Sequence, residues 1–595
     1  MEELSGIPTS PGVAIAEALV LDSQEFPISH RKINAEEVPR EKERFEQSVS
    51  DAIAEIQSIQ QQASDGAAGE YLKIFDAHIS ILRDEELKRG VFEEIESRNC
   101  TAELAVSSVI KRYVRKFLDN EYLKRLVHDL YDIEHTLLRH LHGLKREDLS
   151  HLESDVIIVA KDLSPSQTVT LDKEKVVAFA TDAGGRTSHT AIIARALGIP
   201  AVVGLGSITA EVVGGDLLIV DGGSGAVVVN PDADTLDRYH AEVQNIQEHE
   251  VRLARLRQLP AETTDGHRVR LYANIESPAE VQVAVERGAE GVGLYRTEFL
   301  FFEKGRPPEE EEHYEAYRHV VDALGGRPVA IRTFDMGGDK LVPGESASER
   351  NPFLGCRSIR LCFQNPDLFR TQIRAILRAS ARGNVNILFP MIAMLREIRL
   401  AKRFVHEVMA ELDEEGVPFD RNIEMGIMVE VPSAVWTADL LAQEVDFFSI
   451  GTNDLVQYCL AVDRGNQCVS SLFQPADPAV LRMIRDVITE ARSTGTRVAM
   501  CGEMSGDVVY AILLVGLGLN EFSVSPAVLP QIKEIIRSVS LEYAREVTRQ
   551  ALSFDEAERT VAYLREVTEE LLAEQVQPAP QAARTAGAEA SRKGK

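Results

Sequence analysis

The feature that most constrains the fold is a regular alternation of apolar and helical stretches in the second half of the chain. Eight short runs rich in Val, Ile, Leu, Phe and Met recur between residues 269 and 524, with helical periodicity between them. Eight strand–helix units in succession are typical of a (β/α)8 barrel. The expected strands are Val269–Ile275, Gly291–Arg296, Val329–Phe334, Val385–Met391, Met425–Val431, Phe447–Gly451, Arg497–Met500 and Glu521–Val524. We therefore predict a TIM-type barrel over residues 261–573.

Polar side chains stand at the end of most of these expected strands. They are Asn274, Arg296, Arg332, Asp335, Glu430, Asn453, Asp454 and Cys501. Because barrels of this kind carry their chemistry at the carboxyl ends of the strands, we expect these groups to meet at one mouth. Packing alone does not account for ionisable groups at the ends of successive buried strands.

The residue types at this mouth favour a small anionic ligand. Four arginines could converge there: Arg296, Arg332, Arg357 and Arg464. Guanidinium groups match phosphate and carboxylate oxygens bidentately, so several together favour a ligand with more than one anionic group. Glu430 and Asp454 are hard carboxylates that suit Mg²⁺, and the thiol of Cys501 could serve as a proton donor. Taken singly, an arginine or glutamate is often an ion-pair partner, and a cysteine is often a small core residue.

A second candidate site lies upstream, where a glycine-rich turn precedes a helix. The segment reads Gly184-Gly185-Arg186-Thr187-Ser188-His189 and continues into an apolar helix. The glycines allow a positive φ and a close approach to a ligand, and Thr187 or Ser188 can cap the helix. Free N–H groups at a helix start suit a phosphate. His189 could accept a phosphoryl group there, although a histidine that only caps the helix fits the same pattern.

The remaining pattern predicts a multidomain α/β protein. Buried strands surround the histidine segment and predict a compact α/β domain, whose first residues form a turn over Gly6–Gly12 before a strand. Helical periodicity interrupts this domain and predicts an inserted bundle of four helices, and a charged helix follows as a linker. The predicted parts are residues 1–22 with 146–231 (α/β domain), 23–145 (bundle), 232–260 (linker helix), 261–573 (barrel) and 574–595 (disordered tail).

Composition limits the partners and the compartment. The formal net charge of -29 at pH 7 argues against nucleic acid or an anionic membrane as partner. Many proteins are also acidic simply because a net charge keeps them soluble. No run reaches the roughly 20 apolar residues of a membrane span, and the first residues lack the features of a signal peptide. The six cysteines have no metal-ligand spacing and are expected to be reduced thiols. We expect a cytoplasmic protein.

Five segments together resemble motifs of the phosphoenolpyruvate-utilising enzymes. Gly184–His189 is similar to the phosphohistidine motif of that family, and the other four look like its barrel motifs. Those four are Asp335-Met336-Gly337-Gly338-Asp339-Lys340, Asn351-Pro352-Phe353-Leu354-Gly355, Gly451-Thr452-Asn453-Asp454-Leu455 and Asp463-Arg464-Gly465-Asn466. The likeness extends over nearly the whole chain in the expected domain order.

The resemblance implies a role for each candidate residue. His189 would attack the phosphorus of phosphoenolpyruvate, and Cys501 would protonate the enolate carbon to give pyruvate. Glu430 and Asp454 would hold Mg²⁺. The groups implied to hold the substrate are Arg296, Arg332, Asn453, Asp454 and Arg464, with Arg357 in a matching segment.

The branch of the family that phosphorylates a protein also implies partners. Phospho-His189 would pass its group to a histidine of the phosphocarrier protein HPr, in the first step of sugar uptake by the phosphotransferase system. The inserted bundle, around the acidic Asp84-Glu85-Glu86, would dock HPr. The domain with the histidine would swivel between barrel and carrier, and the barrel would form a homodimer.

Three alternatives stay open at this point. A phosphoenolpyruvate synthase or pyruvate phosphate dikinase would need an ATP-binding domain, and the first 150 residues contain no glycine-rich nucleotide loop. A nitrogen-branch relative would carry an additional N-terminal sensory domain. A sensor that binds phosphoenolpyruvate without turnover would need neither Cys501 as proton donor nor Glu430 and Asp454 as metal ligands.

Overall fold

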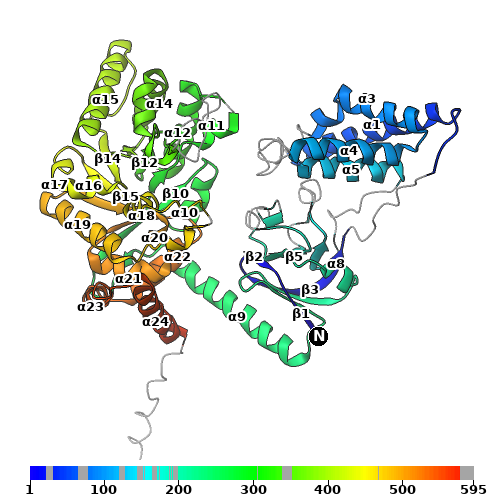
Figure 1. The fold of residues 1–595 in the computed structure, drawn as a ribbon. Helices are drawn as coiled ribbons and strands as arrows, with labels where there is room; N and C mark the ends of the chain where they lie inside the picture. Colours follow the sequence, from blue (N-terminus) through cyan, green and yellow to red (C-terminus); the bar gives the residue numbers. More distant parts are fainter. Residues whose placement is uncertain are drawn as a thin grey trace, which may run out of the picture. The chain divides into compact units, whose positions relative to one another are not determined.

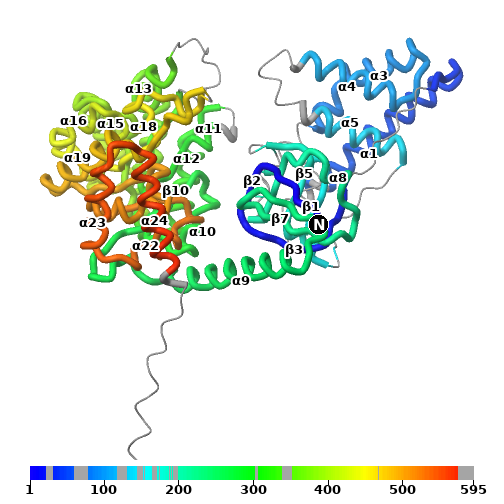
Figure 2. Tube along the Cα trace, turned by 60° about the horizontal axis from the view of Figure 1, so that its bottom comes forward, coloured from blue at the N-terminus to red at the C-terminus, as the bar shows by residue number. Residues whose placement is uncertain are grey.

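The structure is a computed structural model, and the chain divides into two compact units, Met1–His249 and Glu250–Lys595. Figures 1 and 2 show the elements of each unit. None of the described helices is long and apolar enough to cross a membrane. The described residues are 1–21, 31–63, 78–118, 127–143, 152, 154–163, 171–172, 175–185, 188, 190–191, 194, 198–304, 306–337, 351–466 and 468–576.

The second unit contains a closed parallel barrel, as the sequence predicts. Neighbouring strands pair in chain order, and the last strand closes on the first. The strands are β10 (Arg268–Ile275), β11 (Val292–Tyr295), β12 (Val329–Arg332), β13 (Val385–Phe389), β14 (Glu424–Val429), β15 (Phe447–Ile450), β16 (Arg497–Met500) and β17 (Glu521–Val524). Each overlaps one expected strand, so the prediction of a (β/α)8 barrel is confirmed. A short strand, β9 (Ala261–Glu262), pairs antiparallel with the start of β10.

Helices alternate with these strands and surround the barrel (Figure 1). They are α10 (Glu280–Glu286), α11 (Phe299–Lys304), α12 (Glu310–Leu324), α13 (Ile359–Gln364), α14 (Pro366–Ser380), α15 (Leu395–Glu415), α16 (Pro432–Trp436), α17 (Ala438–Leu441), α18 (Thr452–Leu460), α19 (Pro478–Thr494), α20 (Glu503–Gly506), α21 (Val508–Leu517), α22 (Leu529–Ser538), α23 (Leu541–Ala551) and α24 (Ala557–Val576). Helix α19 illustrates their sequence signals. The side chain of Asp477 caps its first turn by accepting from Ala479 N at 2.8 Å, and Gly495 ends it with φ 77°.

Side chains alternate between two apolar layers along the barrel strands. Ile331, Ile387 and Ile427 belong to the large core between strands and helices. Their strand neighbours point inward instead, because successive side chains of a strand face opposite sides. The inward cluster consists of Leu294, Ala330, Leu388, Met428, Phe447 and Cys501. The barrel interior is thus a packed layer, and a site can lie only above it, at the mouth.

The first unit contains a mixed eight-stranded sheet with the order β1-β8-β7-β3-β4-β5-β6-β2. The strands are β1 (Glu2–Ser5), β2 (Ile7–Ser10), β3 (Val13–Val20), β4 (Val156–Ala160), β5 (Val176–Thr181), β6 (Ala201–Val203), β7 (Leu217–Asp221) and β8 (Ala226–Val229), with a short helix α8 (Ile208–Glu211). Strands β3 and β4 pair in parallel although more than a hundred residues separate them in the chain. The helical insertion therefore leaves the sheet continuous.

The expected turn over Gly6–Gly12 is wrong for its central residues, which form strand β2. This strand lies at the sheet edge and pairs antiparallel with β6 alone. Pro8 is tolerated there because an edge strand leaves one side of its backbone unpaired. The hydroxyl of Thr9 donates to the carbonyl oxygen of Ala201 at 2.9 Å and fixes the edge.

Helices occupy the described chain between β3 and β4, as expected from the periodicity. They are α1 (Val38–Ala63), α3 (Glu85–Arg98), α4 (Ala102–Leu118) and α5 (Val127–Leu141). Phe45, Val109 and Ile133 belong to their shared apolar core. Asn99 ends α3 in the left-handed conformation, φ 46°. Helix α9 (Ala233–Leu256) follows β8, and α24 runs to Val576, so the rest of the expected tail, 577–595, lies outside the described residues.

The contact between α21 and α23 generates a stability prediction. A Cβ at Gly516 would lie 2.2 Å from both the carbonyl oxygen of Ala544 and the hydroxyl of Thr548. Gly516→Ala should therefore lower the free energy of unfolding by about 1–3 kcal/mol through overpacking. The matched control is Gly90→Ala in α3, where the new methyl meets only Val109 at 3.5 Å and helix propensity should raise stability by up to about 1 kcal/mol. Thermal unfolding followed by circular dichroism measures both, and equal shifts would contradict this packing.

Candidate active site at the mouth of the barrel

A cavity of about 400 Å³ opens at the carboxyl ends of the barrel strands. Its walls include every barrel residue that the sequence analysis assigned to a catalytic, substrate or metal role. These are Arg296, Arg332, Arg357, Glu430, Asn453, Asp454, Arg464 and Cys501. The structure thus brings together side chains from strand ends that are up to about two hundred residues apart in the chain, as a parallel barrel requires.

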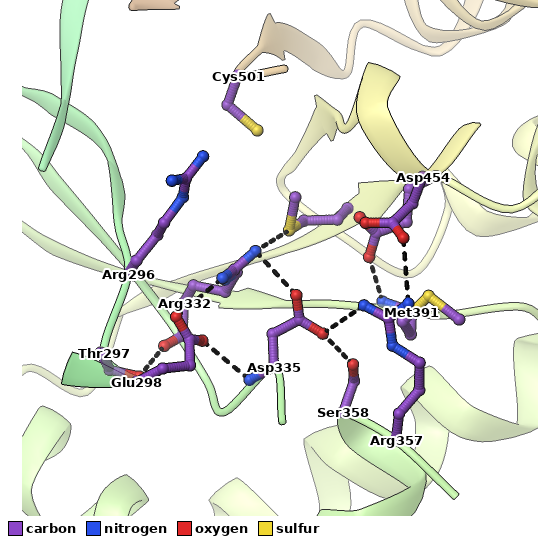
Figure 3. A network of polar contacts seen from close by, with 12 residues as sticks. Arg296, Thr297, Glu298, Arg332, Asp335, Arg357, Ser358, Met391, Asp454 and Cys501 are labelled. Atoms are coloured by element: carbon purple, nitrogen blue, oxygen red, sulfur yellow. Dashed lines mark hydrogen bonds and ion pairs between the residues drawn. The ribbon is translucent and has the colours of Figure 1, made fainter. Parts of the chain in front are cut away.

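Arg332, at the end of β12, is buried between two carboxylates (Figure 3). Its Nη2 donates to Glu298 Oε2 at 3.0 Å, and its Nη1 lies 3.1 Å from Asp335 Oδ2. Burial alone would lower the pKa of Arg332, but the carboxylates of Glu298, Asp335 and Glu430 outweigh it and the pKa is raised. The guanidinium is therefore a fixed positive charge at the cavity wall. Its Nε has no hydrogen-bond partner among the described residues.

Arg357 extends the same chain of ion pairs across the mouth. Its Nη2 donates to Asp335 Oδ1 at 3.1 Å, and its Nη1 donates to Asp454 Oδ1 at 3.1 Å (Figure 3). The phenol oxygen of Tyr458 accepts from the same Nη1 at 3.1 Å. Although burial opposes the charge, Asp335 and Asp454 raise the pKa of Arg357. Asp335 therefore bridges two arginines with its two oxygens, and the hydroxyl of Ser358 also donates to it.

Glu430 follows β14 and is 1% exposed. Its Oε1 accepts from the backbone N–H of Met391 at 2.6 Å, and Met391 adopts a left-handed φ of 57°. A Cβ at Gly451 would lie 2.7 Å from Glu430 Oε2, so this glycine leaves the space that the carboxylate occupies. Burial first, and then the carboxylates of Asp454 and Asp335, raise the pKa of Glu430. A cation at this point would relieve the repulsion.

Cys501 follows β16, is 2% exposed and belongs to the inward apolar layer. The hydroxyl of Ser449 on β15 donates to its Sγ at 3.1 Å. Burial raises the pKa of the thiol; the Ser449 hydrogen bond lowers it in part, and the Glu430 charge raises it further. The balance is a raised pKa, so Cys501 is a protonated thiol at neutral pH. It lies at the same mouth as Arg296 (Figure 3).

The outer rim of the cavity carries the more exposed candidates. Arg296, after β11, pairs with Glu276. Asn453, at the start of α18, exchanges hydrogen bonds with Glu503: its Nδ2 donates to Oε1 at 2.8 Å, and its Oδ1 accepts from Glu503 N at 2.9 Å. The exposed Arg464 also lines the cavity. These groups are held less tightly than Arg332 and Arg357.

Two residues of the site have roles that the sequence reasoning missed. Glu298 is buried and accepts from both Arg332 and the backbone N–H of Asp335, at 3.0 Å each. Its position two residues after Arg296, beyond the same strand, was the available signal. Asn274, expected at the mouth, does not line the cavity; its Nδ2 donates to the carbonyl oxygen of Cys501 at 3.0 Å. Asn274 therefore positions the cysteine.

His189 itself lies outside the described residues, as do Arg186 and Thr187. Around it, Gly184 has a φ of 115°, which only glycine adopts without strain. Ser188 Oγ accepts from the N–H of Ala191 at 3.3 Å, the hydrogen bond of a helix cap. Thr190 is buried and donates to Asp162 Oδ1 at 3.1 Å. The described part of the motif thus has the turn and the cap that the sequence predicts.

Comparison with known proteins first defines the class of enzyme to which the chain belongs. Profiles of three parts of one family match the chain in order: the N-terminal part of PEP-utilising enzymes at residues 5–125, their mobile domain at 152–225 and their PEP-binding domain at 250–541. The PEP-binding profile covers the barrel and its charged mouth. The fold and these matches define a PEP-utilising enzyme, and the resemblance stated from the motifs is confirmed.

Curated relatives narrow the class further. A phosphoenolpyruvate-protein phosphotransferase of Haemophilus influenzae is 43% identical over 574 residues, covering 96% of this chain and 99% of the relative. The protein of the same name from Staphylococcus carnosus is 41% identical, covering 95% and 99%. The chain therefore belongs to the phosphoenolpyruvate-protein phosphotransferase family, which confirms the expected class of transferase. A solved structure titled as Enzyme I is 41% identical over 41% of this chain and 99% of that chain, with a TM-score of 0.37.

The contact of Ser449 with Cys501 generates a prediction of pH dependence. Because the Ser449 hydroxyl lowers the pKa of the thiol, Ser449→Ala should move the pH midpoint of Cys501 alkylation to higher pH. Below that midpoint, less thiolate should be present in the variant, and iodoacetamide should react more slowly. Mass spectrometry of the modified peptides measures both rates. Cys468 is exposed and serves as internal control; an unchanged or lower midpoint for Cys501 would contradict this assignment.

Proposed function

We propose that this protein transfers the phosphoryl group of phosphoenolpyruvate to His189, releases pyruvate, and then phosphorylates a histidine of HPr. This is the first step of sugar uptake by the phosphotransferase system. The observation that carries the proposal is one cavity that combines guanidinium groups, paired carboxylates and a buried protonated thiol. The names of the curated relatives support the same reaction.

The arginines would bind the two anionic groups of the substrate. Arg332 is held in place by its ion pairs, and its Nε has no hydrogen-bond partner among the described residues. Binding of a phosphate or carboxylate there would therefore need little reorganisation of the side chain. Arg296 and Arg464, on the rim, would complete the binding with Asn453. Arg357 is occupied by Asp335 and Asp454 and contributes positive charge from the wall.

The donor set fits Mg²⁺. Within the buried network, the guanidiniums of Arg332 and Arg357 face four carboxylates: Glu298, Asp335, Glu430 and Asp454. Asp454 and Asp335 repel a charge on Glu430 and raise its pKa, so a bound cation would favour the ionised form of Glu430. Glu430 and Asp454 would hold the ion, with water and substrate oxygens completing its shell. Among the described residues no third His, Cys, Asp or Glu joins them as a ligand group. When bound, Mg²⁺ would neutralise phosphate charge during transfer.

The chemical step then requires one nucleophile and one acid. A ring nitrogen of His189 would form a bond to phosphorus while the bond from phosphorus to the enol oxygen breaks. The electron pair left on the enolate would take a proton at the methylene carbon from Cys501 Sγ, giving pyruvate. The raised pKa of Cys501 keeps that proton in place until the enolate forms. Solvent would return a proton to the thiolate after product release.

The other parts of the chain would serve the second transfer. We assign residues 1–22 with 146–231 to a swivelling phosphohistidine domain, 23–145 to HPr docking and 232–260 to the linker; the barrel would form the homodimer. In the docking segment Asp84 caps α3 by accepting from Glu86 N at 2.6 Å. The exposed side chains of Glu85 and Glu86 would then meet a basic carrier. We expect this to take place in the cytoplasm.

Labelling with phosphoenolpyruvate tests the nucleophile. His189→Ala should abolish acid-labile labelling of the full-length protein by ³²P-phosphoenolpyruvate, because no other group is proposed to accept the phosphoryl group. The control is His240→Ala, an exposed histidine on α9, which should label fully. Labelling should also require Mg²⁺ and be lost with EDTA. Continued labelling of His189→Ala would refute the proposal.

Separating the two half-reactions tests the acid. Cys501→Ala should slow pyruvate formation by about 10²–10⁴-fold, the usual contribution of a general acid. Transfer from chemically prepared phospho-His189 to HPr should stay near the rate of the parent protein, because that step needs no proton on carbon. Cys468→Ala, at an exposed position, is the matched control. Loss of the second half-reaction in Cys501→Ala would refute its role as proton donor.

The same assays separate the alternatives. ATP-dependent formation of phosphoenolpyruvate from pyruvate would favour a synthase or dikinase. Binding of phosphoenolpyruvate with neither labelling nor pyruvate release would favour a sensor.

A further inference from the structure

Helix α15 lies on the outside of the barrel (Figure 1). Its residues line most of a second charged surface. We call it the α15 groove; it encloses about 500 Å³. The residues that line it are Arg396, Arg399, Lys402, Arg403, His406 and Glu444. None of them lines the catalytic cavity, so the two surfaces are separate.

The basic side chains of the α15 groove lie on one face of the helix. Arg396, Arg399, Arg403 and His406 follow one another at steps of three, four and three residues, the spacing of neighbours on a helix surface. All four are exposed, and Lys402 is half-buried beside them. The row runs from Arg396 to His406, ten residue steps or about 15 Å along the helix axis. A single small ligand could therefore reach most of these charges.

Most of this positive charge is not neutralised by the protein. Glu444 is the sole carboxylate among the residues that line the groove. It pairs with Arg399 at 2.8 Å and lies 3.9 Å from Lys402 Nζ. Arg396, Arg403 and His406 have no ion pair with any described carboxylate. Many other arginines of this barrel, such as Arg374 with Glu310, do have one.

We propose that the α15 groove binds a small polyanion that carries two or more phosphate groups. Guanidinium forks match phosphate oxygens, and several forks in one groove favour a multivalent ligand. The net charge of -29 argues against a long polyanion, because its distant segments would be repelled by the rest of the surface. A compact ligand keeps all of its charge within about 10 Å of the groove, the range over which charges interact at moderate salt. The proposal does not depend on the function proposed for the catalytic cavity.

Calorimetry with inorganic tripolyphosphate tests this site on the full-length protein. The buffer contains EDTA, which removes free magnesium that would otherwise bind the tripolyphosphate. Tripolyphosphate should bind, and Arg396→Ala/Arg403→Ala should weaken that binding by about tenfold or more, the loss expected from removing two direct contacts. The matched control is Arg545→Ala/Arg549→Ala on α23, which removes two exposed arginines that form no ion pair with any described carboxylate. Neither arginine lines the α15 groove, so this variant should weaken tripolyphosphate binding far less than Arg396→Ala/Arg403→Ala does, because distant surface charges are screened by salt.

Each contrary result overturns the proposal. Absence of binding to the parent protein would refute the site, and equal losses in the two double variants would reduce it to a general effect of charge. Binding of a polyglutamate chain but not of tripolyphosphate would assign the groove to an acidic protein instead. A changed sedimentation coefficient of Arg396→Ala/Arg403→Ala without tripolyphosphate binding would assign it to contact between copies. Thermal unfolding and labelling by phosphoenolpyruvate should be the same in both double variants, which excludes misfolding as the cause.

Discussion

The site depends on one row of charges, which runs from Glu298 through Arg332, Asp335 and Arg357 to Asp454 and is buried except at the partly exposed Asp454. Each link is a contact of 3.0–3.1 Å between an arginine and a carboxylate. Burying a guanidinium costs desolvation free energy, which nearby carboxylates offset. Removal of one partner therefore leaves an uncompensated buried charge. The members therefore hold one another in position before any substrate is bound. The barrel makes this possible, because it places the ends of β11, β12 and β15 around one mouth.

This order has a direct consequence for the proposed chemistry. In phosphoryl transfer the protein mainly positions the reacting groups and supplies charges that are already in place before the reaction. Arg332 supplies such a charge, since its pKa is raised and its side chain is fixed at two points. The rim residues Arg296 and Arg464 are more exposed, which suits groups that must admit the substrate. Arginine thus has two uses at this site: buried and ion-paired it forms a rigid wall, and exposed it forms an adaptable rim.

The sequence predicts most of the barrel because two independent signals coincide there. Apolar runs mark the strands, and polar residues directly after them mark the mouth. It does not predict which polar residue lines the cavity and which supports a neighbour. Asn274 and Glu298 both stand near strand ends, yet one holds the backbone of Cys501 and the other holds Arg332. That difference depends on strand register and side-chain direction across neighbouring strands, and neither can be deduced from one strand alone.

Strand β2 was missed for a related reason. Its local sequence, with Pro8 between two glycines at Gly6 and Gly12, has the composition of a turn. What makes it a strand is the free edge of β6, nearly two hundred residues later, to which Ile7, Pro8 and Ser10 are matched. Local propensity is outweighed there by a pairing partner that the local sequence does not contain.

The protonation of Cys501 shows how the fold sets the chemistry of a single atom. The inward layer that fills the barrel includes Cys501 itself, together with Leu294, Ala330, Leu388, Met428 and Phe447. Burial against these side chains disfavours the thiolate and raises the pKa of the thiol. The Ser449 hydroxyl works in the opposite direction and limits the rise. The packing that closes the barrel core is therefore also what keeps a proton on sulfur, so the acid of the proposed reaction is a property of the barrel as a whole.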